Sequence, residues 1–299
     1  MPDVFILGFT KCATTSVYDA LMSHPNVHNS KVKEPHYHYA KCNGMKYGGP
    51  ADDHTVKQMF VSIEEKYKAL YNSKLMTVDA SAMSINDKLT LKLIADKSPN
   101  SKVILMLREP VQRAFSAYSH MRRDVREILE FEEAIQQELD GKRADWLPIW
   151  QYIDSSRYVD RVKYVREVFG DRLSIFKYES YVEDPYKFMA ELALVLGLGE
   201  HKWVIKHSNK SGDPKSKIIQ KILQRKSFFK SLVVAATPRK ALDKIKAHLI
   251  ERNTGEKQPL DEKAKKLVCS LLSDEMAKID AKHQDFEILN SLYGDVLRD

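Results

Sequence analysis

The feature that most constrains this chain is an apolar segment that ends in a loop of small and hydroxyl-bearing residues. Val4–Leu7 is a short apolar run, and Gly8 follows it directly. From Thr15 to Ser23 the apolar residues recur three and four positions apart, which is the spacing of a helix. We therefore predict a buried strand, a loop and a helix in that order.

Strand and helix candidates alternate along the rest of the chain. The apolar runs Ser101–Leu107 and Leu173–Phe176 are predicted to be further buried strands. The spacing of the apolar residues, together with the positions of Pro and Gly, predicts helices at Val111–Arg123, Glu130–Leu139, Arg157–Phe169, Pro185–Leu196 and Asp261–Ala281. This alternation is typical of an α/β protein with a largely parallel sheet.

Composition excludes several classes of protein. Of the 299 residues, 43% are hydrophobic and 30% are charged, which is typical of a globular chain and not of a disordered or fibrous one. No apolar run approaches the roughly 20 residues of a membrane-spanning helix, and the first residues lack the basic start of a signal peptide. Cys12, Cys42 and Cys269 form neither a disulfide framework nor a metal-binding spacing. We therefore expect a cytoplasmic protein.

The positive charge is concentrated in one block. Residues 201–250 hold thirteen Lys or Arg and two Asp or Glu, a local net charge of +11 against +7 for the whole chain. Solvated helix faces explain such a block, and so does a surface that faces a nucleotide, an acidic glycan or lipid headgroups. Nucleic acid is not expected as a partner, because no RNA-binding aromatic pattern or zinc finger accompanies the charge.

The first loop has the properties of an anion site. A strand-to-helix junction presents backbone N–H groups and the positive end of a helix, and hydroxyls and a lysine add further donors. It is not the phosphate loop of kinases, because Ala13 stands where the second Gly belongs and Thr14 where the Lys belongs. The lysine lies earlier, at Lys11, where it reaches toward the bond being broken.

Two motifs carry a resemblance to a known family. Lys11-Cys-Ala-Thr-Thr15 resembles the K-x-G-T-T loop with which sulfotransferases bind the 5′-phosphosulfate of 3′-phosphoadenosine-5′-phosphosulfate (PAPS), with Ala for the usual Gly. Arg108-Glu-Pro-Val-Gln-Arg-Ala-Phe-Ser116 resembles the family's R-x-P-x-x-R-x-x-S motif for the 3′-phosphate. Ser156-Arg-Tyr158, a helix, a strand, Tyr178-Glu179 and Asp184-Pro185 then follow in the order seen in bacterial and heparan-type members. Asn209-Lys-Ser-Gly212 resembles the late basic loop that closes over the nucleotide's 3′-phosphate.

The resemblance implies a P-loop-like three-layer α/β/α fold with a central, mainly parallel sheet and a helical, basic C-terminal region. It implies one domain, residues 1–299, whose nucleotide-binding core ends near residue 212. The activity implied is transfer of a sulfuryl group from PAPS to a hydroxyl or amine of a small-molecule or carbohydrate acceptor, which releases 3′-phosphoadenosine-5′-phosphate (PAP). No metal is required. Whether the chain forms a homodimer stays open.

The resemblance also implies roles for individual residues. Lys11 would neutralise the charge on the bridging oxygen as the bond to sulfur breaks. The residues expected to bind the nucleotide are Thr10, Cys12, Ala13, Thr14, Thr15, Ser16, Arg108, Ser116, Tyr158, Lys210, Ser211 and Gly212.

An acceptor hydroxyl must lose its proton, so a general base is needed. Lys33-Glu34-Pro-His36-Tyr-His38 is similar to a K/x-E-x-H-F-F stretch of heparan-type members, and this resemblance implies that Glu34 is the base. His36 is the alternative, because cytosolic small-molecule members of the family use a His. A surface turn is the other interpretation of this stretch. Further on, Val78–Ser84 lacks the Lys, Pro and Tyr of those members. Its Asp79 and Ser81 would suit a smaller or cationic acceptor.

Two other functions are weighed against this one. A P-loop kinase needs its lysine later in the loop and an acidic residue after the second strand, where this chain has Arg108. A non-catalytic nucleotide-binding module would lack a usable base, so Lys11 and Glu34 together favour an enzyme.

Overall fold

A four-stranded parallel sheet forms the centre of the molecule, with the strand order β2-β1-β3-β4. The computed structural model describes residues 1–205 and 260–297. The strands are β1 (Val4–Gly8), β2 (Val78–Asp79), β3 (Lys102–Leu107) and β4 (Leu173–Lys177). Three of them coincide with the apolar runs predicted as strands, and β2 was not predicted as one.

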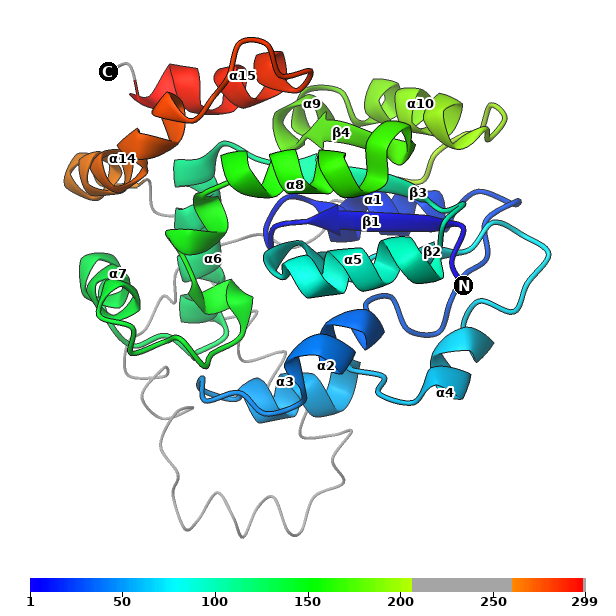
Figure 1. Ribbon diagram of the computed structural model, residues 1–299, viewed down its shortest axis with the longest axis horizontal. Coiled ribbons are helices and arrows are strands. Elements are labelled where there is room, and N and C mark those ends of the chain that lie inside the picture. Colours follow the sequence, from blue (N-terminus) through cyan, green and yellow to red (C-terminus); the bar gives the residue numbers. More distant parts are fainter. Residues whose placement is uncertain (206–259, 298–299) are drawn as a thin grey trace, which may run out of the picture.

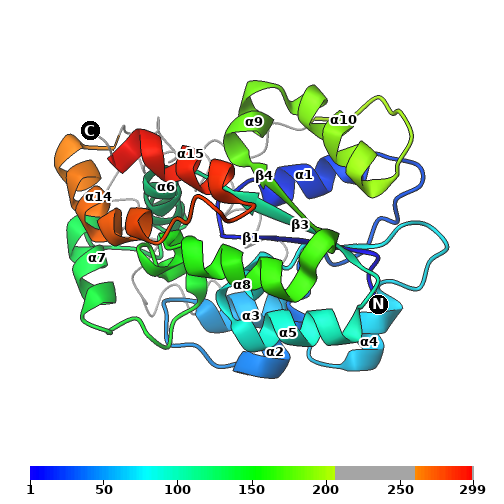
Figure 2. The same cartoon turned by 45° about the horizontal axis from the view of Figure 1, so that its top comes forward.

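Helices cover both faces of this sheet (Figures 1 and 2). On one face lie α1 (Thr14–Leu21) and α10 (Pro185–Leu196), and on the other α5 (Lys88–Lys97) and α8 (Val159–Phe169). All five residues of β1 are buried, and in β3 only Lys102 is exposed. Continuous apolar strands are what a doubly covered parallel sheet requires. The predicted three-layer α/β fold is thereby confirmed.

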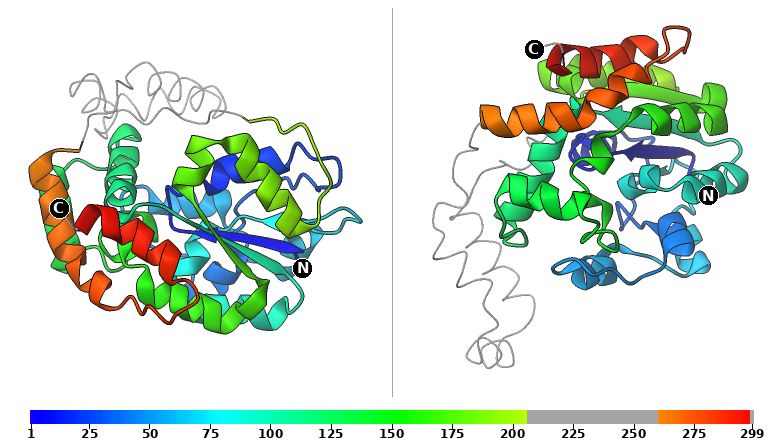
Figure 3. Two further views of the ribbon diagram at one scale, coloured as in Figure 1. Left: turned by 90° about the horizontal axis from the view of Figure 1, so that it is seen from above. Right: turned by 60° about the vertical axis from the view of Figure 1, so that its left-hand side comes forward.

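A second group of helices lies beyond the carboxyl ends of the strands (Figure 3). It consists of α6 (Pro110–Arg123), α7 (Phe131–Leu139), α14 (Glu262–Ala277) and α15 (Phe286–Leu297). The sequence predicted one last helix at 261–281, whereas the chain ends α14 at Ala277 and begins α15 at Phe286.

The remaining elements are short. The helices are α2 (Tyr37–Asn43), α3 (Asp52–Met59), α4 (Glu64–Ala69) and α9 (Tyr178–Glu183). Single 3₁₀ turns occupy Ala82–Asn86, Pro148–Trp150, Asp154–Ser156 and Gly170–Arg172.

The pairing of β1 with β3 sets the position of the two phosphate motifs. Gly8 pairs with Met106, so the loop after β1 and the residue after β3 emerge side by side at one edge of the sheet. A side chain at Gly8 would bring its Cβ to 2.7 Å from the carbonyl oxygen of Met106. Glycine is therefore required where β1 ends, because any larger residue would push the two strands apart.

Some predictions concern residues outside the described ranges. Lys210, Ser211, Gly212 and nearly all of the basic block 201–250 are among them. Of the helices in residues 1–205 and 260–297, none has the length and apolar character to cross a lipid bilayer.

Candidate functional site

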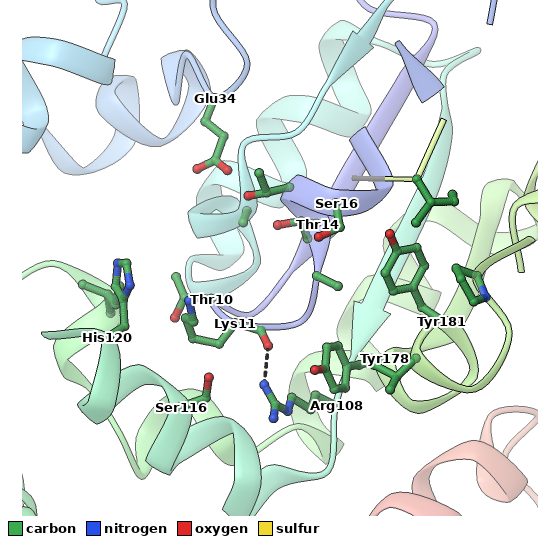
Figure 4. Close-up of a pocket in the computed structure, with 17 residues that line it drawn as sticks. Thr10, Lys11, Thr14, Ser16, Glu34, Arg108, Ser116, His120, Tyr178 and Tyr181 are labelled. Atoms are coloured by element: carbon green, nitrogen blue, oxygen red, sulfur yellow. Dashed lines mark hydrogen bonds between the residues drawn. The ribbon is translucent and has the colours of Figure 1, made fainter. Parts of the chain in front are cut away.

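A cavity of about 530 Å³ lies at the edge where β1 and β3 end (Figure 4). Nine of the residues predicted from sequence to form the site line it, namely Thr10, Lys11, Ala13, Thr14, Thr15, Ser16, Glu34, Arg108 and Ser116. The loop after β1, the junction of β3 with α6 and the segment before α2 therefore meet in one place. Its other lining residues are Ala82, His120, Ile149, Tyr178, Tyr181, Val182, Pro185 and Ile205.

The β1–α1 loop bends sharply before the helix begins. Lys11 and Ala13 have φ angles of 78° and 63°, in the left-handed region that glycine tolerates best, and α1 starts at Thr14. Ala13 stands where the family pattern has glycine, and the backbone angle gives the physical reason for that preference. Thr14, Thr15 and Ser16 form the first turn of α1, where the backbone N–H groups have no partner within the helix.

Two predicted nucleotide ligands lie behind this loop and not in the cavity. Cys12 is fully buried, its backbone N–H donates to the carbonyl oxygen of Phe9, and burial raises the pKa of its thiol to about 12. The ring of Tyr158 is buried and stacks on Phe9 with 4.6 Å between the ring centroids, while its N–H donates to the hydroxyl of Tyr293. Both residues support the loop from the core.

Arg108 joins the two motifs. Its Nη1 donates to the carbonyl oxygen of Lys11 at 3.1 Å, and its guanidinium lies over the ring of Tyr178, 4.1 Å from the centroid. Its buried Nε has no hydrogen-bond partner among the described residues, and neither has the buried hydroxyl of Thr10. Two unpaired buried donors beside a helix N-terminus suit an anion.

Local sequence explains why α6 begins directly after Arg108. The carboxylate of Glu109 accepts hydrogen bonds from the N–H groups of Val111 and Gln112, and Pro110 occupies the first helical position. Ser116 follows two turns later on the face of α6 that lines the cavity.

Positive charge dominates the centre of the cavity. Burial, followed by the charges of Arg123 and Arg108, lowers the pKa of Lys11 to about 8. Burial and Lys11 lower the pKa of His120 to about 3, so this imidazole is neutral at physiological pH. Nη2 of Arg123 donates to Nδ1 of His120 at 2.8 Å, which places the single proton of the neutral ring on Nε2.

Glu34 is the base candidate that reaches the cavity. Burial raises its pKa, but Lys33 and His36 oppose this and the pKa lies at about 2. His36 is fully buried, does not line the cavity, and places Nε2 at 3.4 Å from Oε2 of Glu34. His36 therefore lies behind the carboxylate, in a position to orient it.

Asp79 and Ser81 do not line the cavity. One carboxylate oxygen of Asp79 accepts from the N–H of Ser81 and the other from the hydroxyl of Tyr67, while the hydroxyl of Ser81 accepts from the N–H of His36. Both residues are buried. The expectation that they would face a small or cationic acceptor is not supported, because their polar groups are used within the protein.

Sequence reasoning missed His120, and it gave Tyr178 no role at the site although Tyr178-Glu179 is one of the segments that resemble the family. His120 lies four residues after Ser116 on the same helix, so helical spacing alone would have put it on the same face. Tyr178 begins α9 directly after β4, at the edge of the sheet where the other motifs lie. In Figure 4 Glu34 and His120 are seen toward one side of Lys11 and Thr14, and Tyr178 toward the other.

The sequence model of the sulfotransferase family matches residues 2–202. Human carbohydrate sulfotransferase 15 is 27% identical over an alignment of 172 residues, and the match covers 46% of this chain and 30% of the relative. The membrane-associated sulfotransferase kil1 of Dictyostelium discoideum is 29% identical over 147 residues, 47% of this chain and 28% of the relative. The chain thus spans less than a third of each relative's length.

A solved structure shares the fold. The sulfotransferase from Alicyclobacillus acidocaldarius superimposes with a TM-score of 0.71 over 100% of this chain and 99% of the other, at 21% identity. With two thirds of the sequence matched by the family, the resemblance carried by the phosphate motifs is confirmed: the chain belongs to the sulfotransferase family.

Proposed function

We propose that this protein transfers a sulfuryl group from PAPS to a hydroxyl group of a carbohydrate. The observation that carries the proposal is the contact between the two motifs, in which Arg108 donates to the carbonyl oxygen of Lys11 at the wall of a single cavity. A donor with phosphates at its 3′ and 5′ positions needs two anion sites held at a fixed separation, and this contact ties the two together.

The residues of the cavity fit such a donor. The first turn of α1, with Thr14 and Thr15, would hold the 5′-phosphosulfate, and Arg108 with Ser116 would hold the 3′-phosphate. The Nε of Arg108, which has no hydrogen-bond partner among the described residues, is available as a donor to the 3′-phosphate. An apolar wall that includes Tyr181 and Val182 lies beside them and suits the flat face of a nucleobase.

For this reaction the protein has to position the two substrates and stabilise the charge that develops during transfer. A new bond forms between the acceptor oxygen and sulfur while the bond from sulfur to the 5′-phosphate oxygen breaks. Lys11, once protonated, neutralises the charge that grows on this leaving oxygen. Glu34 accepts the proton of the hydroxyl, and its position in the cavity wall gives it access where His36 has none.

The support for a carbohydrate acceptor comes from the relatives that carry this activity in their names. The matched segment covers 46% of this chain, and the cavity adds an argument of its own. On the chain's own side, Glu34 and His120 bring a hydrogen-bond acceptor and a donor to one cavity. Such a pair suits a polyhydroxylated substrate.

A calorimetric titration with PAP in EDTA tests the donor, with ATP and Mg²⁺ as the comparison. We expect PAP to bind without metal, and transfer from sulfur-35-labelled PAPS to a panel of desulfated polysaccharides and small alcohols then identifies the acceptor. Binding of ATP with Mg²⁺ in the absence of any PAP binding would replace this proposal by the kinase alternative.

A further inference from the structure

Lys33 connects the phosphate loop to the base. Its Nζ donates to Oγ1 of Thr15 at 2.6 Å and forms an ion pair with Oε1 of Glu34. Thr15 belongs to the first turn of α1, and Glu34 lines the same cavity from the segment before α2. One ammonium group therefore touches both the expected anion site and the expected base, which lie 19 positions apart in sequence.

The pair is shielded enough for its charges to matter. The side chains of Lys33 and Glu34 are 23% and 16% exposed, so neither is a freely solvated surface group. An ammonium in contact with a carboxylate stabilises its charged form and makes it a weaker proton acceptor. With Lys33 in this position Glu34 is poorly suited to take a proton from a hydroxyl.

We propose that Lys33 couples donor binding to the base: when a phosphosulfate occupies the first turn of α1, the ammonium transfers its contact from Glu34 to the donor's oxygens. The proposal rests on the proposed function, and it adds an order of events: the donor binds first, and Glu34 then becomes able to accept a proton. Glu34 gains basicity only when a donor is present to react.

Charge and reach both favour this exchange. A phosphosulfate carries two negative charges against one on Glu34, so the ammonium gains more from the donor than it loses. The contact with Thr15 already holds Nζ beside the place that the 5′-phosphate would take. A lysine stem has several rotatable bonds, so a small rotation suffices to change partners.

A double-mutant cycle with PAP as the probe tests the coupling. Titrations use the full chain and the variants Lys33→Met, Glu34→Gln and the two combined. Because Lys33 must leave Glu34 to reach the ligand, Glu34→Gln should tighten PAP binding by about fivefold when Lys33 is present and by less than twofold when it is absent. Lys33→Met should weaken PAP binding by about tenfold, as expected for loss of a charge-assisted hydrogen bond.

Two controls separate this effect from others. Lys31→Met removes the same charge from an exposed position two residues earlier and should change PAP affinity by less than twofold. Lys33→Gln removes the charge but keeps a hydrogen-bond donor for Thr15. Repeating the double-mutant cycle with Lys33→Gln in place of Lys33→Met therefore separates loss of the charge from loss of the contact with Thr15. Thermal unfolding of each variant confirms that the compared proteins are folded.

The outcomes are distinct. Equal tightening by Glu34→Gln with and without Lys33 would show that the carboxylate repels PAP directly, and it would overturn the coupling. Unchanged affinity in Lys33→Met and Lys33→Gln would overturn it as well. Absence of PAP binding in the unmodified protein would reject the proposed function itself, which is a different result from binding without coupling.

Discussion

The guanidinium of Arg108 is held between a ring and a carbonyl, with Tyr178 stacked at 4.1 Å on one side and the backbone of Lys11 accepting a hydrogen bond at 3.1 Å. Arg108 follows β3, Lys11 follows β1 and Tyr178 follows β4, so three neighbouring strand ends converge on one side chain. The stacking fixes the plane of the guanidinium before any ligand arrives, which lowers the entropy lost on binding.

Tyr178 should therefore contribute to PAP affinity through its ring. Tyr178→Ala removes the stacked face and is expected to weaken PAP binding by roughly fivefold, equivalent to about 1 kcal/mol for a cation–π contact. Tyr178→Phe keeps the face and should change the dissociation constant by less than twofold. Calorimetric titration of both variants checks this, and an equal loss in Phe and Ala would assign the effect to the hydroxyl instead.

Lys11 predicts a pH dependence of donor binding. In the free protein the pKa of Lys11 lies at about 8, because burial and the charges of Arg123 and Arg108 disfavour the ammonium. An anionic ligand binds the protonated form better, so PAP affinity is steady below this pKa and falls as pH rises through it. Between pH 7.5 and 9 the loss should approach roughly eightfold, the limit for one linked proton.

The control for this prediction is Lys11→Met. It has no proton to lose at this position, so its PAP affinity should be weaker throughout and independent of pH from 7.5 to 9. A pH dependence that survives in Lys11→Met would belong to another group.

Ala13 is expected to be a position of backbone strain. Its φ of 63° disfavours any residue with a Cβ, at a cost of about 1–2 kcal/mol, whereas glycine adopts it freely. Glycine also makes the unfolded chain more flexible, which costs about 0.4–1 kcal/mol. Ala13→Gly should therefore raise the free energy of unfolding by about 0.5–1 kcal/mol in urea titrations. A loss of stability would mean that the Ala13 methyl contributes packing that outweighs the strain.

His120 should serve as a neutral hydrogen-bond donor and not as a base. Its pKa of about 3 leaves it uncharged from pH 5 to 8, so no ionisation of His120 should appear in the pH–rate profile over that range. His120→Ala is expected to lower kcat/KM for the acceptor by about tenfold, the scale of one hydrogen bond, and to leave PAP affinity within twofold. Equal losses in PAP affinity and turnover would place His120 on the donor side.

Local signals were enough to predict the parts of the site that are continuous in sequence. Gly8 ends a strand and Pro110 begins a helix, and each signal acts within a few residues of itself. The sequence did not predict which residues of the first loop face the cavity and which face the core. Side chains in a loop do not alternate with a regular period, so the burial of Cys12 and the cavity position of Thr14 could not be told apart. Their burial depends on the packing of Phe9 against Tyr158, a contact between distant segments.

Distant contacts also explain what was missed. The strand β2 is two residues long and is defined by its pairing with β1, which residues Val78–Asp79 alone do not signal. The contact between Lys33 and Thr15 depends on how the chain returns to the first turn of α1. The resemblance to the family predicted a base in the stretch around Glu34 without separating its two candidates. The structure separates them, because Glu34 lines the cavity and His36 is buried behind it.

Variants of Glu34 and Lys11 test the proposed chemistry most directly, because the two substitutions should impair different steps. Lys11→Ala should lower both PAP affinity and turnover, the latter by ~10²-fold or more, since it removes the charge opposite the leaving oxygen. Glu34→Gln should lower turnover by ~10²-fold while PAP binding does not weaken, because only proton transfer is lost. Glu65→Gln, an exposed carboxylate exchanged in the same way, provides the control. Near-normal turnover in Glu34→Gln with intact PAP binding would remove Glu34 from the role of base and leave the proton to another group in the cavity.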